Sequence, residues 1–154
     1  MKRIYLDTNV WSRPFDKPSE RISKEVEAFF EILEDASARR YTLIGSVVLD
    51  VEVGNIEKEG KKVAVEWLMS LFISQKVLEV SESEQREIKK SAGLKIPDAS
   101  HIACAIRGKS EYFISCDDEI LRKGKEIEKR YGIKVCNPIE FIRRERRWRQ
   151  RRRM

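Results

Sequence analysis

The segment Arg3-Ile4-Tyr5-Leu6-Asp7-Thr8-Asn9, near the start of the chain, predicts a short apolar strand that ends in a carboxylate. A loop with Pro14 and Pro18 follows, and Ser19 is placed to cap the next helix. The apolar side chains of that helix recur at helical spacing and form one stripe: Ile22, Val26, Phe29, Phe30 and Leu33. A strand that leads into an amphipathic helix is typical of an α/β fold.

Strands and helices alternate along the rest of the chain. We expect strands over residues 41–48, 76–80, 112–116 and 134–136. We expect helices over residues 49–56, 81–92, 97–107 and 118–131, with Gly60 breaking the first and Gly93 stopping the second. A further helix carries Val63, Trp67, Leu68 and Leu71 on one face. This alternation predicts a largely parallel sheet with helices on both faces.

The charge of the chain is divided unevenly. A length of 154 residues favours a single domain, and 32 Lys and Arg against 26 Asp and Glu give a net charge of +6. Residues 143–154, the arginine-rich tail, contain eight Arg and one Glu. The remaining residues 1–142 therefore contain 24 basic and 25 acidic groups, a net charge of −1. The basic character suggests a polyanionic partner for the tail, but it does not explain the body.

The cysteines and the N-terminus indicate the cellular setting. Cys104, Cys116 and Cys136 are isolated from one another, which is typical of reduced thiols in an intracellular protein. The N-terminus reaches Asp7 without an apolar leader, and the most apolar stretch, residues 63–73, is too short to span a bilayer. We therefore expect a cytoplasmic protein that makes no contact with membranes.

Acidic residues occur where the predicted strands end. Asp7 closes the first strand, Glu52 follows the second, and Asp117 follows the strand at residues 112–116. Asp98 stands at the start of a helix, directly after Pro97. Ligands of open parallel sheets bind beyond the carboxyl ends of the strands, so these acids are candidates for one cluster. Any one of them taken alone is more often a cap or turn residue.

A cluster of four acids needs a cation, because neighbouring carboxylates raise one another's pKa values. Oxygen ligands without a set of His or Cys favour Mg²⁺ or Mn²⁺. Such a site suits the hydrolysis of phosphodiester bonds.

Four short segments resemble the motifs of PIN-domain nucleases, particularly the VapC-type toxins. They are Leu6-Asp7-Thr8-Asn9, Ser46 with Glu52, Pro97-Asp98-Ala99-Ser100-His101-Ile102-Ala103, and Ser115-Cys116-Asp117. The resemblance implies a three-layer α/β/α nuclease domain over residues 1–142 that cleaves single-stranded RNA with Mg²⁺ or Mn²⁺. It also implies a metal site formed by Asp7, Glu52, Asp98 and Asp117, with Asp7 and Asp98 as direct ligands. Thr8 and Ser115 would support neighbouring carboxylates, and Asn9 completes the first motif.

Three neighbouring polar residues leave alternatives open. Asp118 could replace Asp117 as the fourth acid, although the Ser-x-Asp pattern favours Asp117. Asp50 lies two residues before Glu52 and is expected at the surface. His101 lies one helical turn after Asp98, where it is either packed and hydrogen-bonded or an acid or base near the site.

The arginine-rich tail is a second candidate for function. Arg146, Arg147, Trp148 and Arg149 could bind RNA through phosphate contacts and stacking, and a solvated extension is an equally good interpretation. Trp11 and Phe15 could touch substrate, but packing is the simpler role for them.

Together these features predict a Mg²⁺- or Mn²⁺-dependent endoribonuclease. Its expected setting is the toxin of a toxin–antitoxin pair, with RNA as substrate, an antitoxin as partner and a homodimer as a further possibility. The alternatives are a housekeeping PIN nuclease in RNA processing or decay and a non-catalytic RNA-binding module. An aspartyl-phosphate domain is less favoured, because it needs one modified Asp rather than four dispersed acids.

Overall fold

In the computed structural model, which describes residues 1–153, five parallel strands form one sheet in the order β3-β2-β1-β4-β5. The strands are β1 (Lys2–Leu6), β2 (Tyr41–Ser46), β3 (Ile73–Val77), β4 (Tyr112–Ile114) and β5 (Lys134–Cys136). Strand β1 lies in the middle, where Ile4 pairs with Leu43 of β2 and with Tyr112 of β4. The predicted parallel sheet is confirmed.

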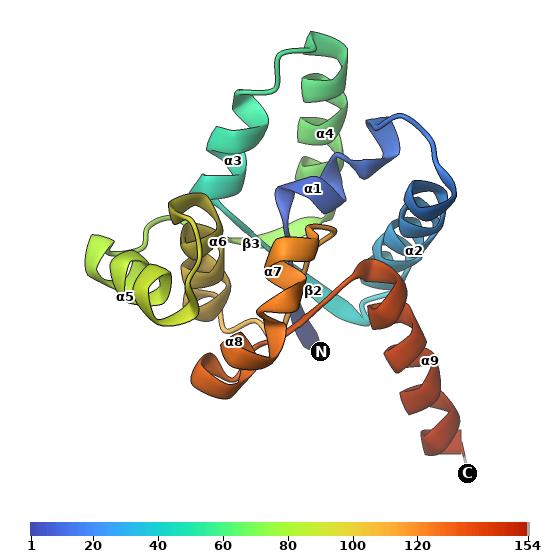
Figure 1. Ribbon diagram of the computed structural model, residues 1–154. Helices are drawn as coiled ribbons and strands as arrows, with labels where there is room; N and C mark the ends of the chain where they lie inside the picture. The colour runs from blue at the N-terminus through green and yellow to red at the C-terminus, as the bar shows by residue number, and fades with distance from the viewer. Residues whose placement is uncertain (154) are drawn as a thin grey trace.

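Helices cover both faces of this sheet, which confirms the three-layer α/β/α architecture (Figure 1). One face carries α2 (Glu20–Ser37), α4 (Glu59–Phe72) and α9 (Pro138–Arg153). The other carries α6 (Ile96–Arg107) and α8 (Gly124–Tyr131), with α5 (Glu82–Ala92) against α6. The short helices α1 (Thr8–Trp11), α3 (Val47–Gly54) and α7 (Asp118–Arg122) follow strands β1, β2 and β4, and the 3-10 turn η1 (Arg13–Phe15) follows α1.

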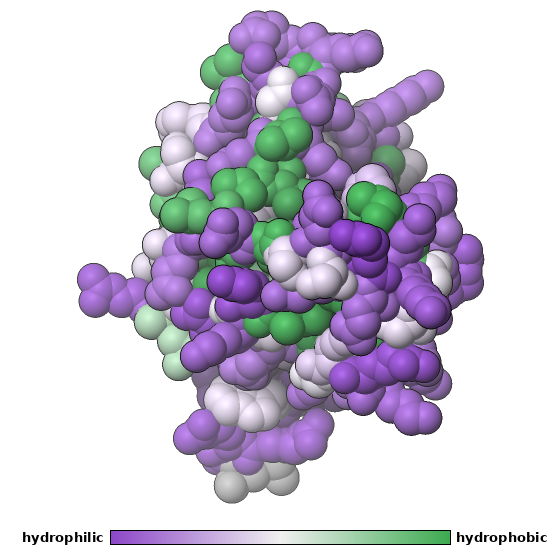
Figure 2. Space-filling view, turned by 90° about the vertical axis from the view of Figure 1, so that its left-hand side faces the viewer, coloured by the Kyte–Doolittle hydropathy of each residue, from purple (hydrophilic) through white to green (hydrophobic). Residues whose placement is uncertain are grey.

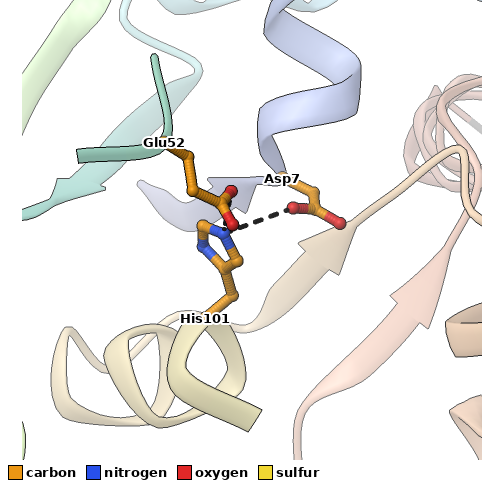
Figure 3. A group of neighbouring side chains, drawn as sticks. All are labelled: Asp7, Glu52 and His101. Carbon is orange, nitrogen blue, oxygen red and sulfur yellow. Dashed lines mark hydrogen bonds and ion pairs between the residues drawn. The ribbon is translucent and has the colours of Figure 1, made fainter. Parts of the chain in front are cut away.

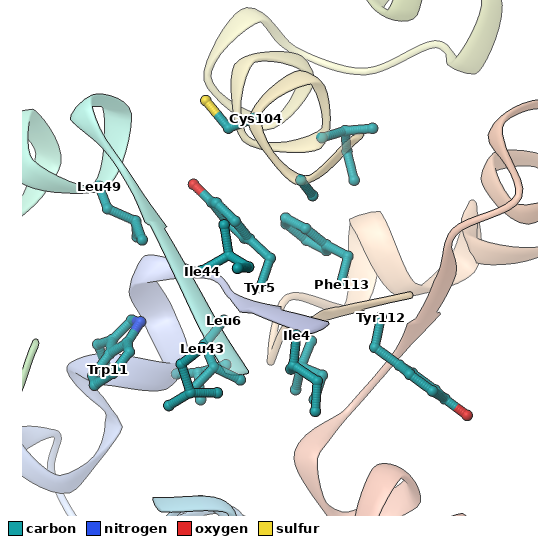
Figure 4. Close-up of a cluster of buried hydrophobic side chains, with 14 of the residues drawn as sticks. Ile4, Tyr5, Leu6, Trp11, Leu43, Ile44, Leu49, Cys104, Tyr112 and Phe113 are labelled. Atoms are coloured by element: carbon teal, nitrogen blue, oxygen red, sulfur yellow. The ribbon is translucent and has the colours of Figure 1, made fainter. Parts of the chain in front are cut away.

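The core is built on the pleat of β1. Successive side chains of a strand point to opposite faces, so Tyr5 points toward α6 and Ile4 points away from it (Figure 4). The ring of Tyr5 stacks on Phe113 of β4 with 5.5 Å between centroids. On the other side, Trp11 is fully buried against Phe29 of α2, which confirms a packing role for this tryptophan.

Several predicted boundaries were wrong by a few residues. Strand β2 ends at Ser46 rather than at residue 48, because the Ser46 hydroxyl accepts a hydrogen bond from the Leu49 amide and starts α3. Strand β3 covers Ile73–Val77 rather than residues 76–80, since α4 ends at Phe72 and the chain pairs at once with β2. Strand β4 ends at Ile114, where the backbone turns toward α7.

Two predicted helix features also differ. The helix expected over residues 118–131 is divided into α7 and α8 at Lys123. Gly124 follows this break and packs closely on Val135. A Cβ added at Gly124 would lie 3.3 Å from the Cβ of Val135. The break after α3 comes at Gly54, and Gly60 lies in the first turn of α4. Gly93 ends α5 as predicted, with a left-handed φ of 66°.

The apolar stripe of α4 faces solvent. Val63, Trp67 and Leu71 are 54%, 62% and 56% exposed, whereas the helix packs inward through Val65 and Met69. The stripe is therefore a free surface of the chain as described.

The arginine-rich tail continues a helix that the sequence analysis did not predict. Helix α9 begins at Pro138 and runs through the expected boundary at residue 142 to Arg153. Phe141, Ile142 and Glu145 are buried, so the first half of α9 packs on the body beside α2. Within residues 1–153, no helix has both the length and the apolar character that a membrane span requires.

Candidate metal centre

The strand order creates a switch point at the carboxyl edge of the sheet, between β1 and β4. The chain passes from β1 to β2 on one side, whereas β4 lies on the other side and leads on to β5. Connections diverge at such a point and leave a crevice, which is where open α/β sheets bind their ligands. Asp7 directly follows β1 and Asp117 follows β4, so both residues lie at this crevice.

Asp7 is held by several donors and is only 5% exposed. Its Oδ1 accepts a hydrogen bond from the Thr8 amide at 2.8 Å. Its Oδ2 accepts hydrogen bonds from Ser115 Oγ at 2.9 Å and from Asn9 Nδ2 at 3.1 Å. Burial raises the pKa of Asp7 above its usual range, and the charge of His101 and the hydrogen bonds offset this only in part. The carboxyl group is thus held in a fixed position, but its ionised form still has a net free-energy cost from burial.

Glu52 and His101 are in direct contact at the site (Figure 3). Glu52 Oε1 lies 2.6 Å from His101 Nε2 and accepts a further hydrogen bond from Thr8 Oγ1. His101 is 1% exposed, and its Nε2 lies 3.7 Å from Asp7 Oδ1. One possible ligand atom from each of Asp7, Glu52 and His101 falls within 4.8 Å of the others. Asp7 directly follows β1, Glu52 lies on α3 and His101 lies on α6, so the fold brings distant parts of the chain together.

The pair shifts the pKa values of both partners. Burial alone raises the pKa of Glu52, but the hydrogen bonds from His101 and Thr8 outweigh it and hold the pKa below its usual range. Burial alone lowers the pKa of His101, whereas its hydrogen bond to Glu52 and the nearby acids raise it above the usual value. Both shifts favour the charged forms of this pair.

A buried chain of hydrogen bonds holds the second ring nitrogen of His101, the one that does not contact Glu52. His101 Nδ1 lies 2.7 Å from the Tyr5 hydroxyl, which lies 2.7 Å from Ser46 Oγ. When both ring nitrogens carry a proton, His101 donates to Glu52 and to Tyr5; when Nδ1 carries none, it accepts the hydrogen bond from Tyr5 instead. Ser46 caps the N-terminus of α3, on which Glu52 stands. The chain therefore ties α3 to β1 and α6 and restricts the position of the Glu52 carboxylate.

Asp98 and Asp117 surround this group at a greater distance. Asp98 is half-buried in the first turn of α6, one turn before His101. Burial, followed by the negative charges of Asp7 and Asp117, raises the pKa of Asp98. The three carboxyl groups are thus close enough to repel one another, although Asp98 and Asp117 lie outside the set of mutually close ligand atoms.

The neighbouring acids point to different partners. Asp117 caps α7, where its Oδ1 accepts a hydrogen bond from the Glu119 amide at 2.9 Å. Asp118 is exposed and makes two hydrogen bonds to the guanidinium of Arg21, at 2.7 and 2.8 Å. This geometry favours Asp117 over Asp118 as the fourth acid of the site.

Asp50 lies outside the site. Its carboxylate pairs at 2.7 Å with Lys76 on the surface. This is the surface position expected for Asp50 from its place two residues before Glu52.

The donor set fits a hard divalent cation. The site offers carboxylate oxygens from Asp7, Glu52, Asp98 and Asp117, while both nitrogens of His101 already make hydrogen bonds. Burial, and for Asp98 also the neighbouring acids, raises the pKa values of Asp7 and Asp98, so a bound cation would offset the cost of ionising them. Oxygen ligands of this kind suit Mg²⁺ or Mn²⁺.

The sequence analysis missed the part played by Tyr5. Its hydroxyl is a polar group in the buried second half of the central strand, and the pleat of β1 turns it toward the helix that carries His101. That alternation was the available signal. His101 is packed and hydrogen-bonded, as one interpretation expected, and it also contacts the acidic group directly.

We expect Asp98→Asn to raise the melting temperature of the metal-free protein in EDTA. The substitution removes a carboxylate whose ionisation is opposed by burial and by Asp7 and Asp117. A raised pKa means that the charged form weakens the fold above that pKa, so the gain should shrink as the pH falls through it. Added Mn²⁺ should raise the melting temperature of the wild type but not of the variant. Equal melting temperatures at every pH would contradict the inferred repulsion.

We expect Tyr5→Phe to weaken Mn²⁺ binding about tenfold or more, because it frees His101 and with it Glu52. The loss of a buried partner should also lower the free energy of unfolding by about 1–3 kcal/mol. Tyr112→Phe is the matched control, since it removes a phenol oxygen from the neighbouring strand on the opposite face. Calorimetric titration with Mn²⁺ measures the effect, and unchanged affinity in Tyr5→Phe would exclude a positioning role.

Comparison with known proteins agrees with this geometry. The family model of the PIN domain matches residues 4–126, a range that contains Asp7, Glu52, Asp98 and Asp117 and ends before α9. No curated protein matches the chain. Because the family model covers most of the chain, the chain belongs to the PIN domain family.

Proposed function

We propose that the chain is a Mg²⁺- or Mn²⁺-dependent endoribonuclease that hydrolyses phosphodiester bonds in single-stranded RNA. The observation that supports this most is the convergence of four acidic residues at the switch point of a PIN domain. Two of these acids, Asp7 and Asp98, have raised pKa values, as expected for carboxylates arranged to share a cation.

Some residues of the site would bind the ion, and others orient the side chains that bind it. We assign Asp7 and Asp98 as direct ligands, with Glu52 and Asp117 completing the acidic site. A bound divalent ion supplies an activated water and offsets the charge that develops on the phosphate.

The side chains around these ligands fix their geometry before substrate binds. Ser115 and Asn9 orient the carboxylate of Asp7. His101 and Thr8 orient the carboxylate of Glu52. Rigid ligands of this kind cost little reorganisation during the reaction. We expect the cleavage to leave a 5′-phosphate and a 3′-hydroxyl.

We further propose that this nuclease is the toxin of a toxin–antitoxin pair in the cytoplasm. The supporting observation is the exposed apolar stripe of α4, with Val63, Trp67 and Leu71 more than half exposed. Apolar surface of this kind is typical of a protein partner, which could be an antitoxin or a second copy of the chain. A housekeeping nuclease in RNA processing or decay would share the metal site but would need no antitoxin.

We expect Asp98→Asn and Asp117→Asn to reduce Mn²⁺-dependent RNA cleavage by about 10²-fold or more, a change of roughly 2.7 kcal/mol in activation free energy. Asp118→Asn is the matched control, because it removes the neighbouring carboxylate that pairs with Arg21 instead. Mixed RNAs incubated with Mn²⁺ or EDTA, followed by mapping of the cut sites, give the measurement.

Two results of this experiment would contradict the assignment. Undiminished cleavage by Asp98→Asn would contradict the assigned metal site. RNA binding without cleavage at any metal concentration would favour the non-catalytic alternative.

We expect expression of the wild type to arrest the growth of a bacterial host, and expression of Asp98→Asn to leave growth unchanged. If a small gene next to this one encodes the antitoxin, its co-expression should restore growth. Growth that is unaffected by an active, well-expressed nuclease would favour the housekeeping role. Colony counts after induction measure the outcome.

A further inference from the structure

The far end of α9 lies at the opposite edge of the sheet from the metal centre. Helix α9 runs beside α2, where Arg146 pairs with Glu31 and Arg149 pairs with Asp35. Glu31 and Asp35 lie in the last part of α2, shortly before β2 begins at the amino edge of the sheet. The two ion pairs therefore place this part of α9 near that edge. The metal centre follows the carboxyl end of β1, and Figure 1 shows α9 extending away from α1. The end of the tail is therefore remote from Asp7.

The positive charge of α9 is concentrated at this far end. The first five arginines of the tail all have acidic partners: Arg143, Arg144 and Arg147 pair with Glu140, Arg146 pairs with Glu31, and Arg149 pairs with Asp35. In contrast, Arg151, Arg152 and Arg153 are exposed and make no ion pair with any residue of 1–153. Three unpaired cations thus lie on the last turn of the helix.

Trp148 lies among these cations. Its ring is 44% exposed, with Lys2 Nζ at 4.6 Å and Arg152 Cζ at 4.9 Å from the ring centroid. A surface pocket of about 680 Å³ opens beside the ring, and its lining includes both cations and Arg153. A second hollow, of about 420 Å³, reaches the ring from the side of Arg151.

Two acidic residues also line the larger pocket, Glu111 and Glu145. Glu145 is buried and pairs with Lys2 at 2.6 Å, which anchors α9 to the start of β1. The surface that combines Lys2, Trp148, Arg151, Arg152 and Arg153 is called the basic edge below.

We propose that the basic edge is a second RNA-binding site, at which the three terminal arginines contact phosphates and Trp148 stacks on a base. The proposal rests on the proposed ribonuclease function, since it gives the same substrate a second point of attachment. Clustered arginines neutralise backbone phosphates, and an exposed indole offers a stacking surface to any base. The basic edge would bind RNA without chemistry, while cleavage takes place at the metal centre.

The composition of α9 favours RNA over a lipid surface. The large apolar side chains of this helix, Phe141 and Ile142, are buried against the body. Trp148 is the only large apolar side chain that α9 exposes within the described residues, so the helix has no apolar face to insert into a bilayer. Hydrophilic surface covers the lower end of the molecule in Figure 2, toward which α9 runs.

The separation of the two sites predicts a dependence on RNA length. Asp7 lies five residue steps after Lys2 along β1, which corresponds to about 16 Å through the sheet. A dinucleotide is too short to reach both sites, whereas an RNA of about 20 nucleotides exceeds this separation even when stacked at roughly 3.4 Å per nucleotide. The basic edge should thus lower KM for long RNA and leave kcat unchanged.

Binding of fluorescent single-stranded RNA of about 20 nucleotides, measured in EDTA by anisotropy, tests the proposal without requiring cleavage. A chain that ends at Gln150 lacks the three arginines but keeps the Lys2–Glu145 pair and Trp148. We expect it to bind about tenfold more weakly, and its dependence of log K on log salt to be shallower by about 2. Trp148→Ala should also weaken binding about tenfold, with the salt dependence unchanged.

The matched control is the triple variant Lys89→Gln, Lys90→Gln and Lys129→Gln, which removes three exposed cations from α5 and α8. It should bind RNA like the wild type. The proposal would be overturned if the control lost as much RNA affinity as the chain that ends at Gln150. It would also be overturned if that shortened chain kept the affinity and the salt dependence of the wild type. A loss of binding to anionic vesicles or an acidic peptide with no loss for RNA would overturn it as well. Failure of cleavage with intact RNA binding would instead contradict only the proposed function.

Discussion

The cost of burying carboxyl groups close to one another, near the carboxyl ends of β1 and β4, is the constraint around which this PIN domain is arranged. Part of it is relieved inside the protein, because Asp7 accepts hydrogen bonds from Ser115 and Asn9, and Glu52 lies against His101. The rest remains, because burial keeps the pKa of Asp7 above its usual range, and burial together with the charges of Asp7 and Asp117 does the same for the pKa of Asp98. A fold that holds acids together at this cost is consistent with a site that functions with a divalent cation.

The rigidly held acidic residues and the surplus positive charge lie at opposite edges of the same sheet. At the carboxyl edge, buried hydrogen bonds through Tyr5 hold the ligands in fixed positions, as a metal site requires. At the amino edge, the arginines of α9 are mostly exposed and the ring of Trp148 is open to solvent. The net charge of +6 reflects this division, because the body is close to neutral and the surplus lies on α9.

The sequence alone predicted the α/β/α layers, because β-branched strands and amphipathic helices alternate clearly along the chain. It also placed Asp7 and Asp117 at one edge, since the carboxyl ends of parallel strands share that edge. It could not predict the contact between His101 and Glu52, which depends on how α3 and α6 pack across β2. Helix α9 was missed because its charged positions outnumber its apolar ones, and its packing depends on tertiary contacts with α2.

Anomalous diffraction from crystals of the protein grown with Mn²⁺ tests the metal site most directly. The account predicts a peak bounded by the carboxylates of Asp7 and Asp98, with Glu52 and Asp117 around it, and no such peak in crystals of Asp98→Asn. A peak at another place in the molecule, or none at saturating Mn²⁺, would contradict the account.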